Sequence, residues 1–139
     1  MLLWCLWCAA KFEQPGELVI RKAMDLSQQW TRSVSAPLRE IRRTLKSQTG
    51  GAQGGEVEDL RRRVKEDELL AERIEQLSLE SLAAGNLAPI ENDRDVAARA
   101  RKALAAYVRM TGAARTADFS VSLLEDLIGL SFPASEWTT

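Results

Sequence analysis

The sequence contains no histidine among its 139 residues. Histidine is the commonest general base and metal ligand among protein side chains, and the usual proton switch near neutral pH. Its absence excludes Ser-His-Asp and Cys-His catalysis within this chain. We therefore assign no catalytic residue, no metal site and no cofactor, and we expect a protein that is not an enzyme. A carboxylate or arginine site of an unfamiliar kind stays open as an alternative.

Cysteine is almost as scarce, because only Cys5 and Cys8 occur. Two cysteines cannot build a disulfide framework, so nothing argues for an oxidising compartment. Their Cys-x-x-Cys spacing can form a redox dithiol or half of a zinc site. A zinc site needs two further ligands, and a dithiol needs solvent, whereas the surrounding residues MLLWCLWCAA are apolar. We expect both side chains in the core, with a dithiol redox protein as an alternative function.

No apolar run is long enough to cross a membrane. The apolar run Met1–Ala10 has about half the required length, and no basic segment precedes it as in a signal peptide. We expect a cytoplasmic protein without a membrane partner, in which Leu2–Phe12 forms a mostly buried helix. If that helix is only partly covered, its exposed apolar surface favours a homodimer.

The clearest periodicity runs from Val19 to Leu45, where apolar residues recur every three or four positions. This spacing predicts a single helix face over Glu17–Lys46. Pro37 lies inside it and removes the hydrogen bond to the carbonyl of Ser33. We favour one kinked, continuous helix; the alternative is two helices, with Pro37 in the first turn of the second.

Glycine is concentrated in residues 48–55, QTGGAQGG, which predicts a flexible linker. A long charged helix is expected over Glu56–Ala84, and Gly85-Asn86 and Pro89 stop it. Its apolar stripe is expected to comprise Val57, Leu60, Val64, Leu70, Ile74, Leu77 and Leu82.

Two shorter helices follow in the last third of the chain. One is capped by Asn92 or Asp93 and runs through Met110, with an inner face made by Val96, Ala100, Ala103, Leu104, Tyr107 and Val108. The other spans about Ser120 to Leu130, and residues 132–139 form a loose tail. No segment shows the alternation of a strand. The predicted fold class is all-α, one domain over residues 1–139: an irregular bundle of about five helices, with one long kinked and one long charged helix.

Basic residues gather on the polar side of the kinked helix, at Arg39, Arg42, Arg43 and Lys46. The net charge of the chain is only −1, so any attraction to a charged partner depends on such a local patch. The leading hypothesis is a non-enzymatic adaptor that presents this basic face to an acidic protein. A nucleic-acid-associated protein using the same face ranks below it. The other interpretation is intramolecular pairing with Glu56, Glu58, Asp59 and Glu66.

Several elements in the first part of the chain share one pattern. They are LLWCLWCA at Leu2–Ala9, then Trp30, then Pro37-Leu38-Arg39 with Arg42, Arg43, Leu45 and Lys46, and then Arg61, Val64, Glu68, Leu69, Ala71, Glu72 and Gln76. Over about Leu2–Leu82 the chain thereby resembles an uncharacterised proteobacterial family of all-helical proteins, a domain of unknown function. The resemblance implies a cytoplasmic helical protein and no particular activity. Family members carry a further helical segment before the first element, which leaves open whether Met1 is the true start.

Overall fold

The computed structural model describes residues 1–48, 53–90, 95–112 and 121–132, and these residues are predominantly helical. The described residues contain no β-strand; a single backbone bridge pairs Phe12 with Pro89. No helix in these ranges combines the length and apolar character needed to span a membrane. The predicted all-α class is confirmed. The elements are α1 (Leu2–Lys11), α2 (Glu17–Trp30), the π-helical turn η1 (Thr31–Ser35), α3 (Ala36–Ser47), α4 (Gly54–Asn86), α5 (Val96–Thr111) and α6 (Val121–Ser131).

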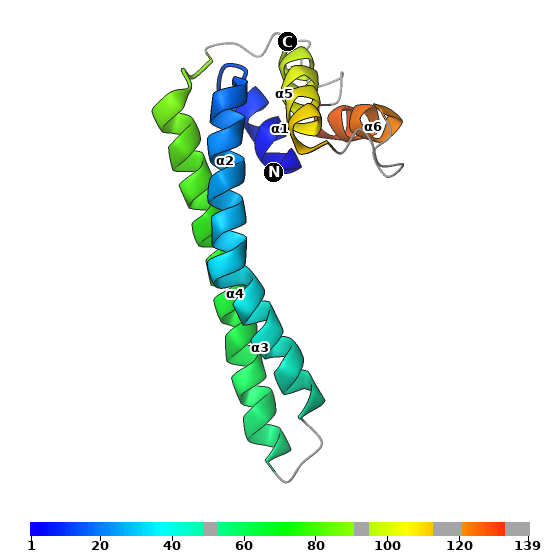
Figure 1. The fold of residues 1–139 in the computed structure, drawn as a ribbon. Helices are drawn as coiled ribbons and strands as arrows, with labels where there is room; N and C mark the ends of the chain where they lie inside the picture. Colours follow the sequence, from blue (N-terminus) through cyan, green and yellow to red (C-terminus); the bar gives the residue numbers. More distant parts are fainter. Residues whose placement is uncertain (49–52, 91–94, 113–120, 133–139) are drawn as a thin grey trace. The chain divides into compact units, whose positions relative to one another are not determined.

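The kinked helix predicted over Glu17–Lys46 is continuous, as α2, η1 and α3. Its π turn is closed by the amide of Ala36, which donates to the carbonyl of Thr31 five residues earlier. Pro37 has no N–H to give, and its ring clashes with a carbonyl one turn back. A wider π turn relieves that clash without ending the helix. Figure 1 shows the helix axis changing direction where α2 passes into α3.

The chain forms two compact units. The first, called the terminal unit here, contains Met1–Met24 together with Glu80–Thr139. The second, called the hairpin unit, contains Asp25–Leu79. Because the chain enters and leaves the hairpin unit through α2 and α4, each of these helices contributes residues to both units.

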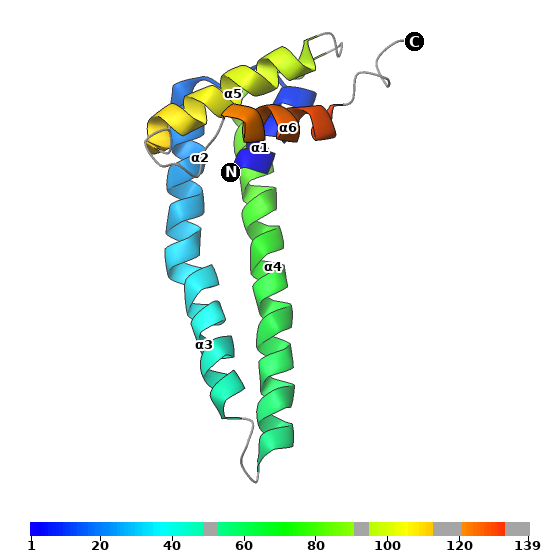
Figure 2. The ribbon, with the colours of Figure 1, turned by 90° about the vertical axis from the view of Figure 1, so that its right-hand side faces the viewer.

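In the terminal unit, α1 packs against α5, and α6 packs against the same helix (Figure 2). The prediction that α1 is mostly buried is confirmed, since Trp4, Cys5, Leu6, Cys8 and Ala9 are all buried. The inner face predicted for α5 is also confirmed, with Tyr107 half-buried and the rest buried. The small alanine side chains on this face allow α1 and α5 to approach closely. Arg99 of α5 also donates a hydrogen bond of 2.9 Å from its Nε to the backbone carbonyl of Ala9 in α1.

In the hairpin unit, α3 and α4 lie side by side and run in opposite directions (Figure 2). The apolar stripe predicted for α4 is wrong in part. Its members Leu60, Leu70, Ile74 and Leu77 are exposed, whereas Val64 is buried as predicted. Ala71 and Leu79, which the predicted stripe did not include, are buried as well. The reason is that α4 carries apolar residues on more than one line, and the line with the small Ala71 faces the neighbouring helix.

Several predicted boundaries shift by one or two residues. The helix α4 begins at Gly54 and ends at Asn86, so Gly85 lies inside it rather than stopping it. The side-chain amide of Asn86 donates a hydrogen bond to the backbone carbonyl of Leu82, four residues earlier in α4. Asp95 occupies the position before α5 but makes no capping hydrogen bond with its side chain, whereas the predicted caps Asn92 and Asp93 lie outside the described residues. The same holds for the linker centre, residues 49–52, and for the tail, residues 133–139.

Candidate functional site

The basic face predicted on α3 is partly engaged within the hairpin unit. Arg42 Nε lies 2.5 Å from Glu68 Oε2, and Arg39 lies 3.6 Å from the carboxylate of Glu72. Both acceptors are on α4, so these pairs join the two arms of the hairpin. The interpretation as intramolecular pairing is therefore right for Arg39 and Arg42, although their acidic partners are Glu72 and Glu68 rather than the predicted ones.

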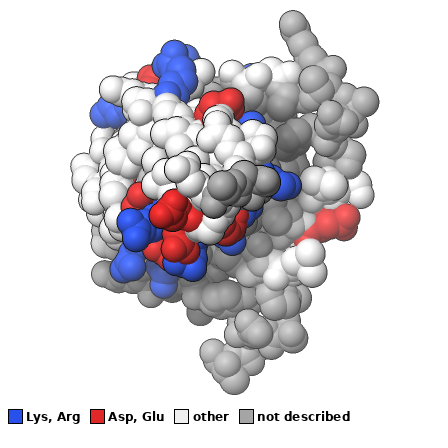
Figure 3. Space-filling view, turned by 90° about the horizontal axis from the view of Figure 1, so that it is seen from below, with Lys and Arg blue, Asp and Glu red and all other residues white. Residues whose placement is uncertain are grey.

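Arg43 and Lys46, the other two residues of the predicted basic face, are exposed. Arg43 makes no ion pair with any residue that the structure describes. Acidic and basic side chains alternate on the neighbouring turn of α4, where Arg61 pairs with Glu58 and Arg62 with Asp59. Figure 3 shows both charge signs side by side over this end of the molecule. The surface is thus mixed in charge and does not form a patch of one sign.

The seam between the arms of the hairpin is unusually polar. Ser27 Oγ donates to Glu75 at 2.6 Å, and Glu68 is only 12% exposed. Three buried polar atoms in this unit have no hydrogen-bond partner among the described residues: Ser35 Oγ, Arg61 Nε and Glu68 Oε1. Such atoms are costly to bury. Their burial therefore offsets part of the stabilisation that apolar contacts in the seam provide.

Several large apolar side chains of α4 lie instead on its exposed side, although Val64 and Leu79 are buried. Leu60 is 48% exposed, Leu70 55%, Ile74 39% and Leu77 52%. Together with Arg63 and Asp67 they recur every three or four residues, so all six share one side of the helix. We call this set the outer face of α4.

The outer face and the ion pairs lie on different flanks of α4. Successive residues of a helix are rotated by about 100°, so Leu70 and Glu72 diverge to opposite sides of the buried Ala71. Glu72 and Glu68 point to the arginines of α3, and Leu70 therefore points away from them. The spacing of the six residues in the sequence predicts that they share one side of the helix. It does not say whether that side is buried or exposed, because this depends on where the neighbouring helix lies.

Cys5 and Cys8 are fully buried in the terminal unit and form no disulfide. Burial raises the pKa of the Cys5 thiol to about 11. Burial, together with the neighbouring Cys5, raises the pKa of Cys8 to about 12. Both thiols are therefore protonated at neutral pH, and a protonated thiol is a poor nucleophile and a poor metal ligand.

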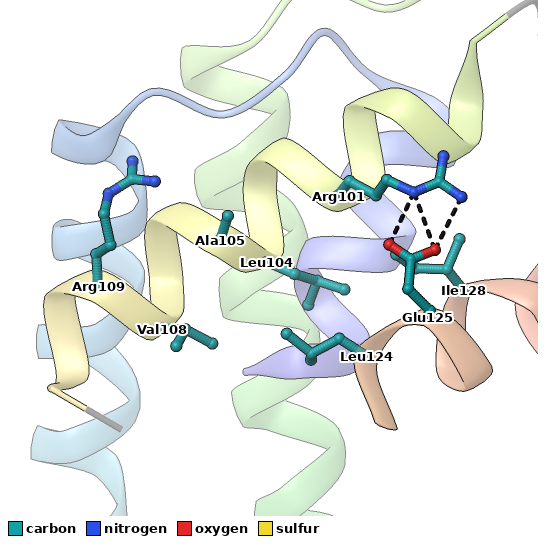
Figure 4. Close-up of a pocket in the computed structure, with 8 residues that line it drawn as sticks. All are labelled: Arg101, Leu104, Ala105, Val108, Arg109, Leu124, Glu125 and Ile128. Carbon is teal, nitrogen blue, oxygen red and sulfur yellow. Dashed lines mark hydrogen bonds and ion pairs between the residues drawn. The ribbon is translucent and has the colours of Figure 1, made fainter. Parts of the chain in front are cut away.

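A groove of about 330 Å³ lies between α5 and α6 in the terminal unit (Figure 4). Its walls are apolar, with Leu104 on α5 and Leu124 on α6. At its rim Arg101 holds Glu125 through hydrogen bonds of 2.9–3.0 Å. This hydrogen bonding lowers the pKa of the Glu125 carboxyl. The rim charges thus neutralise each other, and the groove offers apolar contact rather than acid–base chemistry.

A family model described as a protein of unknown function, DUF2390, matches residues 1–79. That range covers more than half of the chain and includes α1 and the complete hairpin unit. No curated protein and no solved structure matches the chain.

Proposed function

The chain belongs to the DUF2390 family of proteins of unknown function, and we propose that it is a non-enzymatic protein–protein interaction protein. The predicted resemblance to a family of unknown function is confirmed over residues 1–79. The family match ends at residue 79, where the hairpin unit also ends. The hairpin unit is therefore the first place to look for a function that family members share.

One observation carries the proposal: the hairpin unit buries polar groups in its seam and exposes apolar ones outside. Four leucine and isoleucine side chains of the outer face are 39–55% exposed on a single helix. A row of exposed apolar side chains on one side of a helix, here interrupted by Arg63 and Asp67, is typical of an interaction site, because covering it removes apolar area from water. Fully burying one such side chain contributes about 1.5–3 kcal/mol, and these half-exposed ones would contribute a fraction of that each.

The basic side of α3 supports a second candidate, an acidic protein partner. The observation that favours it is the exposed guanidinium of Arg43, which lacks an ion pair within the described residues. Arg39 is also 45% exposed, and its 3.6 Å contact with Glu72 is long. We rank this candidate second because the neighbouring acidic side chains reduce its net positive potential, and for the same reason we rank nucleic acid third.

A tagged full-length chain, used in a pull-down at moderate salt, tests the proposal. We expect the double variant Leu70→Glu/Ile74→Glu to lose the protein that the wild type retains. Leu69→Glu is the matched control, because Leu69 is 59% exposed on the same helix but lies off the outer face. Arg43→Glu tests the second candidate in the same experiment.

Each result assigns the interaction to one surface. Loss with Leu70→Glu/Ile74→Glu and retention with Leu69→Glu supports the outer face. Loss with Arg43→Glu alone favours the basic side. Equal retention by all variants contradicts both candidates, provided that circular dichroism shows the same helix content in every variant.

A further inference from the structure

We propose that the Leu60–Leu70 part of the outer face of α4 is covered by a second copy of this chain, with the two α4 helices antiparallel about a two-fold axis that crosses them at the level of Lys65 along the helix. The inference rests on the proposed function, since it names the partner of the same surface. It goes further by stating the register of the pairing. The evidence is the order of residues on the outer face, and the observation that its two charged residues, Arg63 and Asp67, have no ion-pair partner among the described residues.

Four of the six residues of the outer face are mirrored around Lys65, whereas the mirror positions of Ile74 and Leu77 are Glu56 and Gln53. Leu60 and Leu70 lie five residues on either side of Lys65, and Arg63 and Asp67 lie two residues on either side. In a two-fold antiparallel pair, residues equally distant from the axis face each other across the interface. Leu60 of each copy then meets Leu70 of the other, and each Arg63 meets the Asp67 of the other copy. An unrelated partner helix requires no such symmetry.

The two charged residues of the outer face are available for this pairing. Arg63 and Asp67 are exposed, and neither forms an ion pair with a described residue. Four arginines of the hairpin unit have carboxylate partners, namely Arg39, Arg42, Arg61 and Arg62, whereas Arg43 resembles Arg63 in having none among the described residues. In the proposed dimer, Arg63 of each copy forms an ion pair with Asp67 of the other copy, so both charges gain a partner of opposite sign.

The charge of the whole hairpin unit also permits self-association. Between Asp25 and Leu79 the sequence carries ten basic and ten acidic residues. A net charge of zero creates no long-range repulsion between two copies. A partner of strong net charge, in contrast, would gain no electrostatic attraction from this unit as a whole.

The size of the contact predicts a reversible dimer. With the axis at Lys65, residues 54–76 of the two α4 helices overlap, which is about 33 Å at 1.5 Å per residue. A contact of that length buries on the order of 1,000 Å², which is the lower end for a stable interface. Dimerisation should therefore depend on concentration and respond to the loss of a few contacts.

Sedimentation velocity of the full chain from roughly 1 to 200 µM tests the inference. We expect a monomer–dimer equilibrium for the wild type. Arg63→Asp creates two contacts between aspartates and Asp67→Arg two contacts between arginines, so each should raise the dissociation constant at least about tenfold. Mixing these two variants in equal amounts should restore a dimer, because every charge then meets its opposite. The double variant R63D/D67R should also restore it.

Lys65→Glu is the control for charge reversal as such. Lys65 is exposed and lies about half a turn around the helix from Arg63 and Asp67, so its reversal should leave the dimer unchanged. A wild type that stays monomeric overturns the inference, and so does failure of the mixture when each variant keeps its helix content. The pull-down then decides the proposed function separately. If Leu70→Glu/Ile74→Glu loses a different protein, the outer face has another partner; if it loses none, both proposals fail.

Discussion

The indole Nε1–H of Trp30 donates a hydrogen bond of 3.0 Å to the backbone carbonyl of Ala71. Trp30 is the last residue of α2, and Ala71 is a small, buried residue in the middle of α4. The small side chain lets the indole approach the α4 backbone closely enough to reach a carbonyl. This contact fixes the register of α2 against α4. The hydrogen bond from Ser27 to Glu75, about one helical turn away, is consistent with the same register.

Replacing Trp30 by phenylalanine removes the donor and keeps most of the ring. We expect the free energy of unfolding to fall by about 1 kcal/mol, the usual value of one such hydrogen bond. Urea titration followed by far-ultraviolet circular dichroism measures it. Trp7→Phe serves for comparison and should cost less, because the structure shows a ring contact with Phe12 for Trp7 but no hydrogen bond to a described residue.

Arg42→Met should destabilise the hairpin more than removal of a surface ion pair does. Glu68 is 12% exposed, so losing Arg42 leaves its carboxylate without its ion-pair partner. We expect a loss on the order of 2 kcal/mol, and a partial recovery in the double variant Arg42→Met/Glu68→Leu. Arg62→Met is the control, since the Arg62–Asp59 pair is more than half exposed and should be worth less than about 1 kcal/mol. Equal losses in denaturant titrations would contradict the assignment of Glu68 to a buried seam.

The buried thiols predict a loss of stability at high pH. The pKa values of Cys5 and Cys8 are raised from an ordinary value of 9.0 to about 11 and about 12. Between pH 9 and 11 the unfolded chain releases thiol protons that the folded chain retains, so the free energy of unfolding falls as the pH rises. Below about pH 8 the thiols are protonated in both states and contribute almost no slope.

Urea titrations at several pH values measure this slope, and the variant Cys5→Ala/Cys8→Ala should show a shallower one. A thiol reagent at pH 8 gives an independent check. It should react slowly with the native protein and rapidly with both cysteines in denaturant. Rapid reaction in the native state would place the thiols at the surface and return weight to the redox alternative.

Two glycines should respond to alanine in opposite directions. Gly112 follows α5 with a φ of +69°, a left-handed conformation that alanine adopts only at a cost of about 1 kcal/mol. Gly85 lies inside α4, where an added methyl group meets no atom within 4 Å. Gly85→Ala should therefore raise the free energy of unfolding by about 0.5–1 kcal/mol. Thermal unfolding of the two variants, compared with the wild type, measures both signs.

The features that sequence reasoning predicts well are those set by neighbouring residues. The continuity of the helix through Pro37 follows from an apolar spacing that stays in phase on both sides. The inner face of α5 is predicted correctly because the larger apolar residues of this helix lie on a single side of it. The predicted ends of the helices are less accurate. Gly85 is expected to end α4, but a glycine can also continue a helix, and α4 runs on to Asn86.

The sequence by itself determined that this protein is helical, where its long helices run, and that α1 and α5 supply a core. These properties depend on hydrogen bonds and side-chain spacing within a few residues. Only the tertiary structure decided which side of α4 is covered and which basic residues of α3 are engaged. Arg42 and Glu68 are 26 residues apart, and their pairing depends on how two helices rotate against each other. Because α4 has apolar residues on two lines, that rotation turned Leu70 outward, and local pattern alone cannot specify it.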